Sequence, residues 1–132
     1  MDKITDVIAG IIPNKDGKIL IAQRKGEPLP LDGKWEFPGG KIKPGETSEG
    51  CLERELWEEF GIKVRVGNFF EENVHDYGFV KIRLIAHWVE YLSGKFESRV
   101  HYGTRDVYPY EMINIDFAEA DIALVERLLR GC

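Results

Sequence analysis

Three glutamates between residues 55 and 59 form the pattern in this sequence that is best suited to chemistry. Glu55, Glu58 and Glu59 occupy positions i, i+3 and i+4, and on a helix this spacing brings their carboxylates to one face. Like charges at such short range repel one another, whereas Mg²⁺ and Mn²⁺ prefer hard oxygen ligands. The spacing therefore favours a divalent-metal site; the alternative is an acidic helix face that is only solvated.

The helix that carries these glutamates is predicted over residues 47–60. Gly61 supplies a stop signal, and either Thr47 or Ser48 is suited to cap the first turn. Apolar side chains recur every four positions and face the core, at Leu52, Leu56 and Phe60.

The rest of the chain consists mainly of strand patterns. Residues 4–12 and 18–22 flank a turn signal and predict a hairpin, and residues 25–45 contain so many prolines and glycines that we expect a shaped loop. Further strands are predicted at 62–70 and 80–92 and near Val107, and a final amphipathic helix at 118–129. This order indicates an α+β fold in which helices pack on a mixed sheet.

Size, charge and cysteine content limit the possible functions. The 132 residues are enough for one domain, residues 1–132, with a core that needs no disulfides. A net charge of −5 argues against binding a nucleic acid polymer, but it allows a small anionic substrate if a metal supplies positive charge. Cys51 and Cys132 form no paired motif, and no segment has the length of a membrane span, so we expect a cytoplasmic protein.

A longer motif surrounds the three glutamates. Gly40 is followed after five residues by Glu46, and after seven more by Arg54-Glu55-Leu56-x-Glu58-Glu59-x-Gly61-Ile62. This pattern resembles the Nudix box at every fixed position, and the preceding Trp-Glu-Phe-Pro-Gly-Gly-Lys-Ile segment, residues 35–42, is similar to the loop of the MutT-type branch of Nudix hydrolases. The resemblance implies the Nudix fold, a mixed sheet packed between helices as an α/β/α sandwich.

The resemblance also implies roles for residues of the box. Glu55, Glu58 and Glu59 would hold a divalent metal, expected to be Mg²⁺ with Mn²⁺ as a substitute, and the carbonyl of Gly39 would complete its shell. Glu58 or Glu59 would also accept a proton from the attacking water. Arg54 would orient a box carboxylate; the alternative is an ordinary i, i+4 surface ion pair.

Other residues match positions that MutT-type enzymes use to bind substrate. Arg24 matches an arginine of the substrate pocket, and Asp121 matches the residue that reads the base edge, although it is also suited to be the N-cap of the last helix. Phe37 and Tyr77 either stack on the base or belong to the core. Glu46 either stabilises the helix N-terminus or lies in an outer metal shell.

One part of the sequence departs from the MutT-type pattern. Relatives often carry a Glu-His pair downstream of the box, with the Glu as an extra metal ligand, but here Val100 precedes His101. Either the box suffices, or Glu97 or Asp106 replaces the missing ligand, or activity is reduced. His101 fits a structural role as well as a catalytic one.

The resemblance implies hydrolysis of a nucleoside triphosphate to the monophosphate and pyrophosphate, acting on ordinary, oxidised or methylated nucleotides of the 8-oxo-dGTP or CTP and methyl-dCTP type. One alternative is a Nudix hydrolase of another nucleoside diphosphate linked to a group X, such as a sugar nucleotide or dinucleoside polyphosphate. Another is a Nudix-fold binding module without turnover. The expected partner is the small nucleotide itself, and the protein is expected to be a monomer or a homodimer.

Overall fold

The computed structural model describes residues 3–26 and 31–131, so residues 27–30 of the predicted loop and Cys132 lie outside the described residues. The predicted α+β class is confirmed. The strands are β1 (Ile4–Ile11), β2 (Ile19–Gln23), β3 (Trp35–Glu36), β4 (Gly39–Lys41), β5 (Lys63–Asp76), β6 (Lys81–Ser93) and β7 (Gly103–Val107). The helices are α1 (Ser48–Phe60), the short 3₁₀ helix η1 (Pro109–Asn114) and α2 (Glu119–Leu129).

The strands form two sheets. The larger has the order β4-β1-β6-β5 and is mixed, because β1 runs parallel to β6 while its other pairs are antiparallel. The smaller sheet, β3-β2-β7, is antiparallel. The predicted pairing of β1 with β2 as a hairpin is wrong, because the two strands belong to different sheets. Next to the predicted turn, an isolated bridge joins Pro13 to Ile19. A strand has only two edges, and β4 and β6 occupy both edges of β1, so β2 pairs elsewhere.

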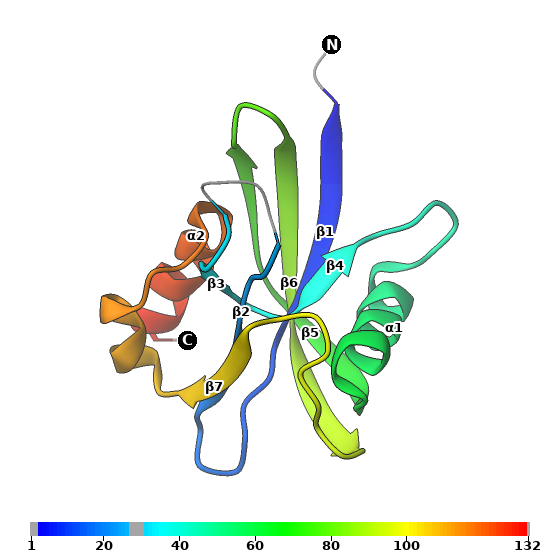
Figure 1. Ribbon diagram of the computed structural model, residues 1–132, viewed down its shortest axis with the longest axis vertical. Helices are drawn as coiled ribbons and strands as arrows, with labels where there is room; N and C mark the ends of the chain where they lie inside the picture. Colours follow the sequence, from blue (N-terminus) through cyan, green and yellow to red (C-terminus); the bar gives the residue numbers. More distant parts are fainter. Residues whose placement is uncertain (1–2, 27–30, 132) are drawn as a thin grey trace.

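The two helices lie on opposite sides of the strands, which confirms the predicted sandwich (Figure 1). Each helix covers its own apolar cluster. The cluster under α1 includes Ile8, Leu20, Leu52, Leu56, Phe60 and Val89, and the cluster under α2 includes Ile11, Ile21, Phe117, Leu124 and Val125. Burial of such side chains contributes about 1.5–3 kcal/mol each, so the sheet holds both helices firmly.

Helix α1 has the predicted boundaries. The Thr47 hydroxyl accepts a hydrogen bond from the Gly50 N–H at 3.0 Å and caps the first turn. Gly61 ends the helix with a φ of 70°, a conformation that glycine adopts without steric cost, and its N–H donates to the Trp57 carbonyl. The box glutamates therefore lie on the predicted helix.

Other boundaries differ from the prediction. Strand β5 continues to Asp76 rather than ending at Phe70, because it stays paired with β6 while exposed side chains alternate with half-buried ones, although most of both sets are polar. Its register shifts between Val66 and Phe69 and again before Glu71, so the strand is bulged there. Helix η1 was not predicted. No helix in the described part of the chain is long and apolar enough to cross a membrane.

Candidate active site

A cleft of about 360 Å³ receives residues from both sheets and from both helices. Its wall includes the β3–β4 segment, the last turn of α1, the β5–β6 turn and the first turn of α2. Of the predicted site residues, the cleft is lined by Arg24, Phe37, Gly39, Glu59 and Asp121. Glu36, Tyr77, Val100 and His101 also line it.

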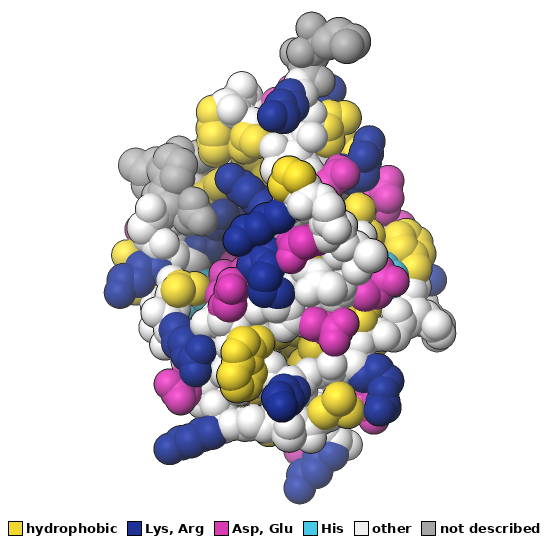
Figure 2. Space-filling view, turned by 90° about the vertical axis from the view of Figure 1, so that its right-hand side faces the viewer, with side chains coloured by type: hydrophobic (Ala, Val, Ile, Leu, Met, Phe, Trp, Pro, Cys, Tyr) yellow, Lys and Arg dark blue, Asp and Glu magenta, His cyan; other side chains and the backbone are white. Residues whose placement is uncertain are grey.

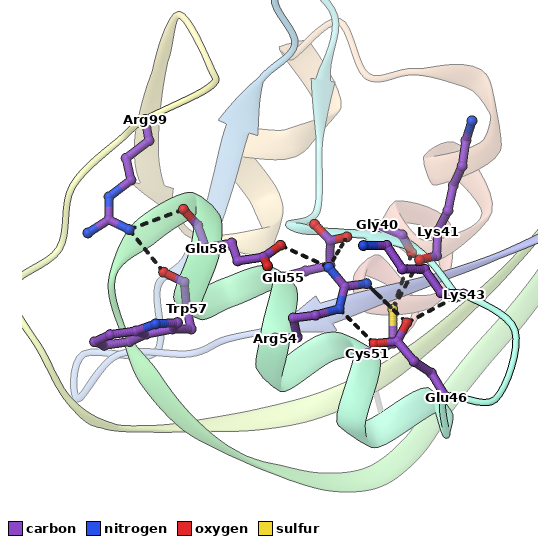
Figure 3. A network of polar contacts seen from close by, with 10 residues as sticks. All are labelled: Gly40, Lys41, Lys43, Glu46, Cys51, Arg54, Glu55, Trp57, Glu58 and Arg99. Carbon is purple, nitrogen blue, oxygen red and sulfur yellow. Dashed lines mark hydrogen bonds and ion pairs between the residues drawn. The ribbon is translucent and has the colours of Figure 1, made fainter.

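Arg54 is the centre of a network of charged groups beside this cleft (Figure 3). Its Nε donates to Oε2 of Glu46 at 2.6 Å and its Nη2 donates to Oε1 at 3.0 Å, which is a two-pronged contact. Its Nη1 donates to Glu55 at 3.1 Å and to Glu58 at 2.9 Å. The predicted pairing of Arg54 with box carboxylates is therefore observed, and three carboxylates are oriented by one guanidinium.

Glu46 serves this network rather than the helix N-terminus, which Thr47 caps. Its carboxylate accepts hydrogen bonds from Arg54 and from the Lys43 N–H. These bonds, that from Arg54 first, lower the pKa of Glu46 from 4.5 to about 2. Figure 2 shows the face on the α1 side of the molecule, where basic and acidic side chains lie next to one another. A place for Glu46 in an outer metal shell stays a prediction.

Glu59 is the box carboxyl that faces the cleft. Burial, followed by the negative charge of Glu55 and a hydrogen bond to it, raises the pKa of Glu59 from 4.5 to about 8, and Glu36 and Glu58 add to the effect. The carboxyl of Glu55 lies against Gly40. A Cβ at position 40 would come within 2.4 Å of the Glu55 carboxyl carbon. The box therefore needs glycine at position 40 to leave room for Glu55.

The expected convergence of three glutamates is only partly correct. Glu55 and Glu59 are in contact, whereas Glu58 is turned to Arg54 and is 55% exposed. Among the described residues, no three His, Cys, Asp or Glu side chains already form a cage for a cation. These carboxyl oxygens nevertheless fit a hard divalent cation. The neighbouring carboxylates oppose the ionisation of Glu59, and a bound cation would stabilise its charged form.

Asp121 lies on the opposite helix, in the first turn of α2, and is 4% exposed. Its Oδ2 accepts a hydrogen bond from the Phe37 N–H at 2.9 Å. Burial and then the charge of Glu36 raise the pKa of Asp121 from 3.8 to about 8, so its ionisation is disfavoured in the folded protein. The alternative prediction of an N-cap is wrong, since Ala118 occupies that position and the Asp121 side chain faces another segment.

The two predicted aromatic wall residues differ in burial. The Phe37 ring belongs to the core and stacks on Phe117 with ring centroids 5.4 Å apart, so its main contribution to the cleft is its backbone N–H. The Tyr77 ring is only partly buried and lines the cleft directly.

Glu36 joins the two sides of the cleft, and sequence reasoning missed it. Its carboxylate accepts from Arg24 Nη1 at 2.8 Å and pairs with His101 Nε2 at 2.9 Å. Its charge also raises the pKa of both Glu59 and Asp121. The only signal in the sequence is a charged residue between the aromatic Trp35 and Phe37, and this signal names no partner.

The segment downstream of β6 adds no acidic ligand to the cleft. Val100 lines the cleft at the position where the MutT-type pattern described above would have a Glu. The suggested replacements are not supported: Asp106 lines a different groove, and Glu97 does not line the cleft and lies 3.8 Å from Arg99. Among the described residues, Glu36, Glu59 and Asp121 are the acidic side chains that line the cleft.

The same segment holds the C-terminal end of α1. Arg99 Nη1 donates to the carbonyls of Trp57 and Glu58 at 3.2 and 3.1 Å (Figure 3). The Arg99 N–H donates to the Glu59 carbonyl at 3.2 Å, and the Glu97 N–H donates to the Phe60 carbonyl at 2.9 Å. The carbonyls of Glu58, Glu59 and Phe60 lack partners within the helix and gain them here, and the Trp57 carbonyl gains a second partner beside the Gly61 N–H.

The comparison with protein families decides how this site is to be interpreted. The NUDIX domain profile matches residues 3–122. The chain belongs to the Nudix family. Nudix hydrolases generally need a divalent metal, in agreement with the donor set described above.

Two curated Nudix relatives match along nearly their whole length. The chain is 36% identical over 127 residues to the CTP pyrophosphohydrolase of Escherichia coli strain K12, covering 96% of this chain and 93% of the relative. It is 37% identical over 131 residues to the putative 8-oxo-dGTP diphosphatase 2 of Mycobacterium tuberculosis strain H37Rv, covering 95% and 90%.

Solved structures agree with the Nudix fold. The solution structure of the E. coli ORF135 protein aligns with a TM-score of 0.86 at 35% identity, covering 98% of this chain and 91% of that one. The MutT protein from Methanosarcina mazei Go1 aligns with the same TM-score at 24% identity, covering 98% and 95%, and supports the fold.

Proposed function

We propose that this Nudix protein hydrolyses nucleoside triphosphates to the monophosphate and pyrophosphate. The observation that carries the proposal is one cleft with a protonatable box glutamate, Glu59, and a buried carboxyl, Asp121, on different helices. Glu59 is suited to a metal-bound phosphate group, and Asp121 is suited to hydrogen-bond a nucleotide base. The names of the two relatives, a CTP pyrophosphohydrolase and a putative 8-oxo-dGTP diphosphatase, support the proposal.

The proposed chemistry divides between the box and the bound metal. Glu55, Glu58 and Glu59, with the Gly39 carbonyl, would hold the divalent cation, for which we propose Mg²⁺ with Mn²⁺ as a substitute. When bound, the cation supplies positive charge that stabilises the phosphate oxygens in the transition state. Arg54 keeps Glu55 and Glu58 in position.

Proton transfer is assigned to Glu59. In its ionised form, which a bound cation would stabilise, Glu59 accepts a proton from the attacking water. The water oxygen bonds to the phosphorus of one of the two linked phosphates, α or β, and the bridging oxygen leaves with the other, so that the monophosphate and pyrophosphate form. Glu59 is preferred over Glu58 because it lines the cleft, whereas Glu58 is bound to Arg54.

Base recognition is assigned to Asp121 with Arg24 beside it. A protonated carboxyl both donates and accepts a hydrogen bond, which matches an edge that presents an amine beside a ring nitrogen, as in cytosine, or the altered edge of an oxidised purine. We propose cytidine triphosphates, including methylated ones, and oxidised purine triphosphates as the two substrate classes.

The remaining predictions belong to the same proposal. We propose that residues 1–132 act as one catalytic domain on a small nucleotide, which the match over residues 3–122 supports. A cytoplasmic location and a monomeric or homodimeric state stay predictions.

Product analysis by chromatography with mass detection tests the proposal. The protein is incubated with Mg²⁺ or Mn²⁺ and a panel of ordinary, methylated and oxidised triphosphates, with EDTA as the control. We expect metal-dependent monophosphate and pyrophosphate from at least one of the two proposed substrate classes. Turnover only of sugar nucleotides or dinucleoside polyphosphates would replace the substrate class. Metal and nucleotide binding without any turnover would favour a binding module, in agreement with the missing acid at Val100.

A further inference from the structure

The first turn of α2, which carries Asp121, has no cap from its own sequence. Ala118 occupies the N-cap position and makes no side-chain hydrogen bond to the helix. The carboxyl of Asp121 does not return to the helix either, because it accepts from the Phe37 N–H. The first N–H groups of a helix have no partner within the helix, so another segment must supply one.

The β5–β6 hairpin supplies that partner. The Tyr77 hydroxyl accepts a hydrogen bond from the Ala120 N–H at 2.8 Å. Asn73, on the same hairpin, donates its side-chain N–H to the Ala120 carbonyl at 3.0 Å. Both polar backbone atoms of the residue before Asp121 are therefore held by side chains that lie more than 40 positions earlier in the sequence.

The Tyr77 side chain is itself fixed in place. Its ring lies edge to face with His75 at 4.5 Å between centroids and stacks on Phe79 at 5.9 Å. The ring lines the cleft together with Asp121. The hydroxyl accepts from Ala120 and keeps its own proton for donation, and no acceptor for that proton occurs among the described residues.

We infer that Tyr77 is a specificity-determining positioning residue: its hydroxyl fixes the first turn of α2 so that Asp121 meets both the Phe37 N–H and the base. The inference rests on the proposed function, in which Asp121 reads the base. Its consequence is that base choice depends on a contact between the hairpin and α2, and not only on the side chains that touch the base.

The variant Tyr77→Phe separates the hydroxyl from the ring. It keeps the aromatic wall and removes the acceptor for Ala120. The matched control is Tyr91→Phe, which removes a hydroxyl that donates to the Gly94 carbonyl and does not line the cleft. Steady-state kinetics over the nucleotide panel and thermal unfolding are measured for both variants.

For Tyr77→Phe we expect KM for the favoured triphosphate to rise about tenfold, the fold-change that corresponds to loss of one well-placed hydrogen bond. We expect kcat to change less than KM, and the preference among bases to narrow. Tyr91→Phe should lower the melting temperature but keep the preference. Unchanged preference in Tyr77→Phe, or an equal fall in kcat for every base, would overturn the inference.

A second measurement keeps the inference separate from the proposed function. Amide hydrogen exchange by NMR reports the Ala120 N–H directly, without any substrate. If the protein turns over no triphosphate while Tyr77→Phe speeds exchange at Ala120 and shifts the Asp121 carboxyl signal, the proposed function fails but the positioning role stands. If neither signal changes, the positioning role is wrong whatever the substrate is.

Discussion

At the scale of single residues, the structure distinguishes two glutamates that the sequence leaves equivalent. Glu59 lines the cleft, whereas Glu58 is more exposed and bound to Arg54. We therefore expect Glu59→Gln to lower kcat by about 10²–10⁴-fold, the contribution typical of a positioned general base, and Glu58→Gln to lower it less. Metal-dependent kinetics with matched circular dichroism spectra measure both. A greater loss in Glu58→Gln would transfer the base role to Glu58.

Arg54 allows a second prediction at this scale. Its guanidinium makes two parallel hydrogen bonds to Glu46 and reaches Glu55 and Glu58 with the remaining nitrogen, a geometry that an ammonium group does not reproduce. Arg54→Lys should therefore lower kcat about tenfold although the charge is kept. NMR titration should also show the pKa of Glu46 rising from about 2 towards 4.5. Full activity with an unchanged Glu46 titration would show that the fork is not needed.

At the scale of elements, helix α1, which carries the box, is held at its end by a segment distant in sequence. Arg99 caps α1 at the carbonyls of Trp57 and Glu58, next to the box glutamates. We expect Arg99→Ala to lower the free energy of unfolding by about 1 kcal/mol, through loss of these bonds and of a positive charge near the C-terminal end of the helix. We expect kcat to fall by more than the small loss of folded protein can account for, because the last turn of α1 carries Glu58 and Glu59.

The control for this prediction is Arg65→Ala, which removes an exposed ion pair with Glu90 between β5 and β6 and leaves the carbonyls of α1 untouched. Denaturant unfolding and kcat are measured for both variants. If Arg99→Ala and Arg65→Ala behave alike, the segment that contains Arg99 does not support the site.

The elements that the sequence predicts well are the local ones. Helix α1 has its cap, its apolar period and its stop glycine within 15 consecutive positions, residues 47–61, so its boundaries are predictable. The partner of β2 is not, because it depends on β4 and β6 taking both edges of β1. Pairing of distant strands leaves no short-range pattern in the chain.

At the scale of the whole molecule, the same distinction applies to the site. The box is contiguous and was found as a motif, whereas the remainder of the cleft forms only when distant segments meet. Glu36 and His101 are 65 positions apart, and Tyr77 and Ala120 are 43 apart. Their side-chain types are ordinary in isolation, so neither contact could be predicted from spacing. The residues proposed for base recognition are for this reason less predictable from the sequence than the box.

The two carboxyls with raised pKa values make the stability of the whole fold depend on pH. Asp121 and Glu59 have pKa values of about 8 in the folded protein, against 3.8 and 4.5 ordinarily, so between these limits the folded state binds more protons than the unfolded state. The free energy of unfolding should therefore fall as pH rises from about 4 to 8, and the buried Asp121 contributes up to about 1.4 kcal/mol per pH unit. Below pH 4 and above pH 8 this dependence should disappear.

Denaturant unfolding in EDTA at pH 5, 6, 7 and 8 measures this slope. Asp121→Asn should flatten it, because the amide does not titrate, and Mg²⁺ should reduce the remaining part, because a cation stabilises the charged form of Glu59. Stability that rises with pH, or a slope that is unchanged in Asp121→Asn, would mean that Asp121 is ionised in the folded protein. Asp121 could then only accept hydrogen bonds, so it would favour a base that presents an amine. The proposal that Asp121 also donates a hydrogen bond to the base would have no support.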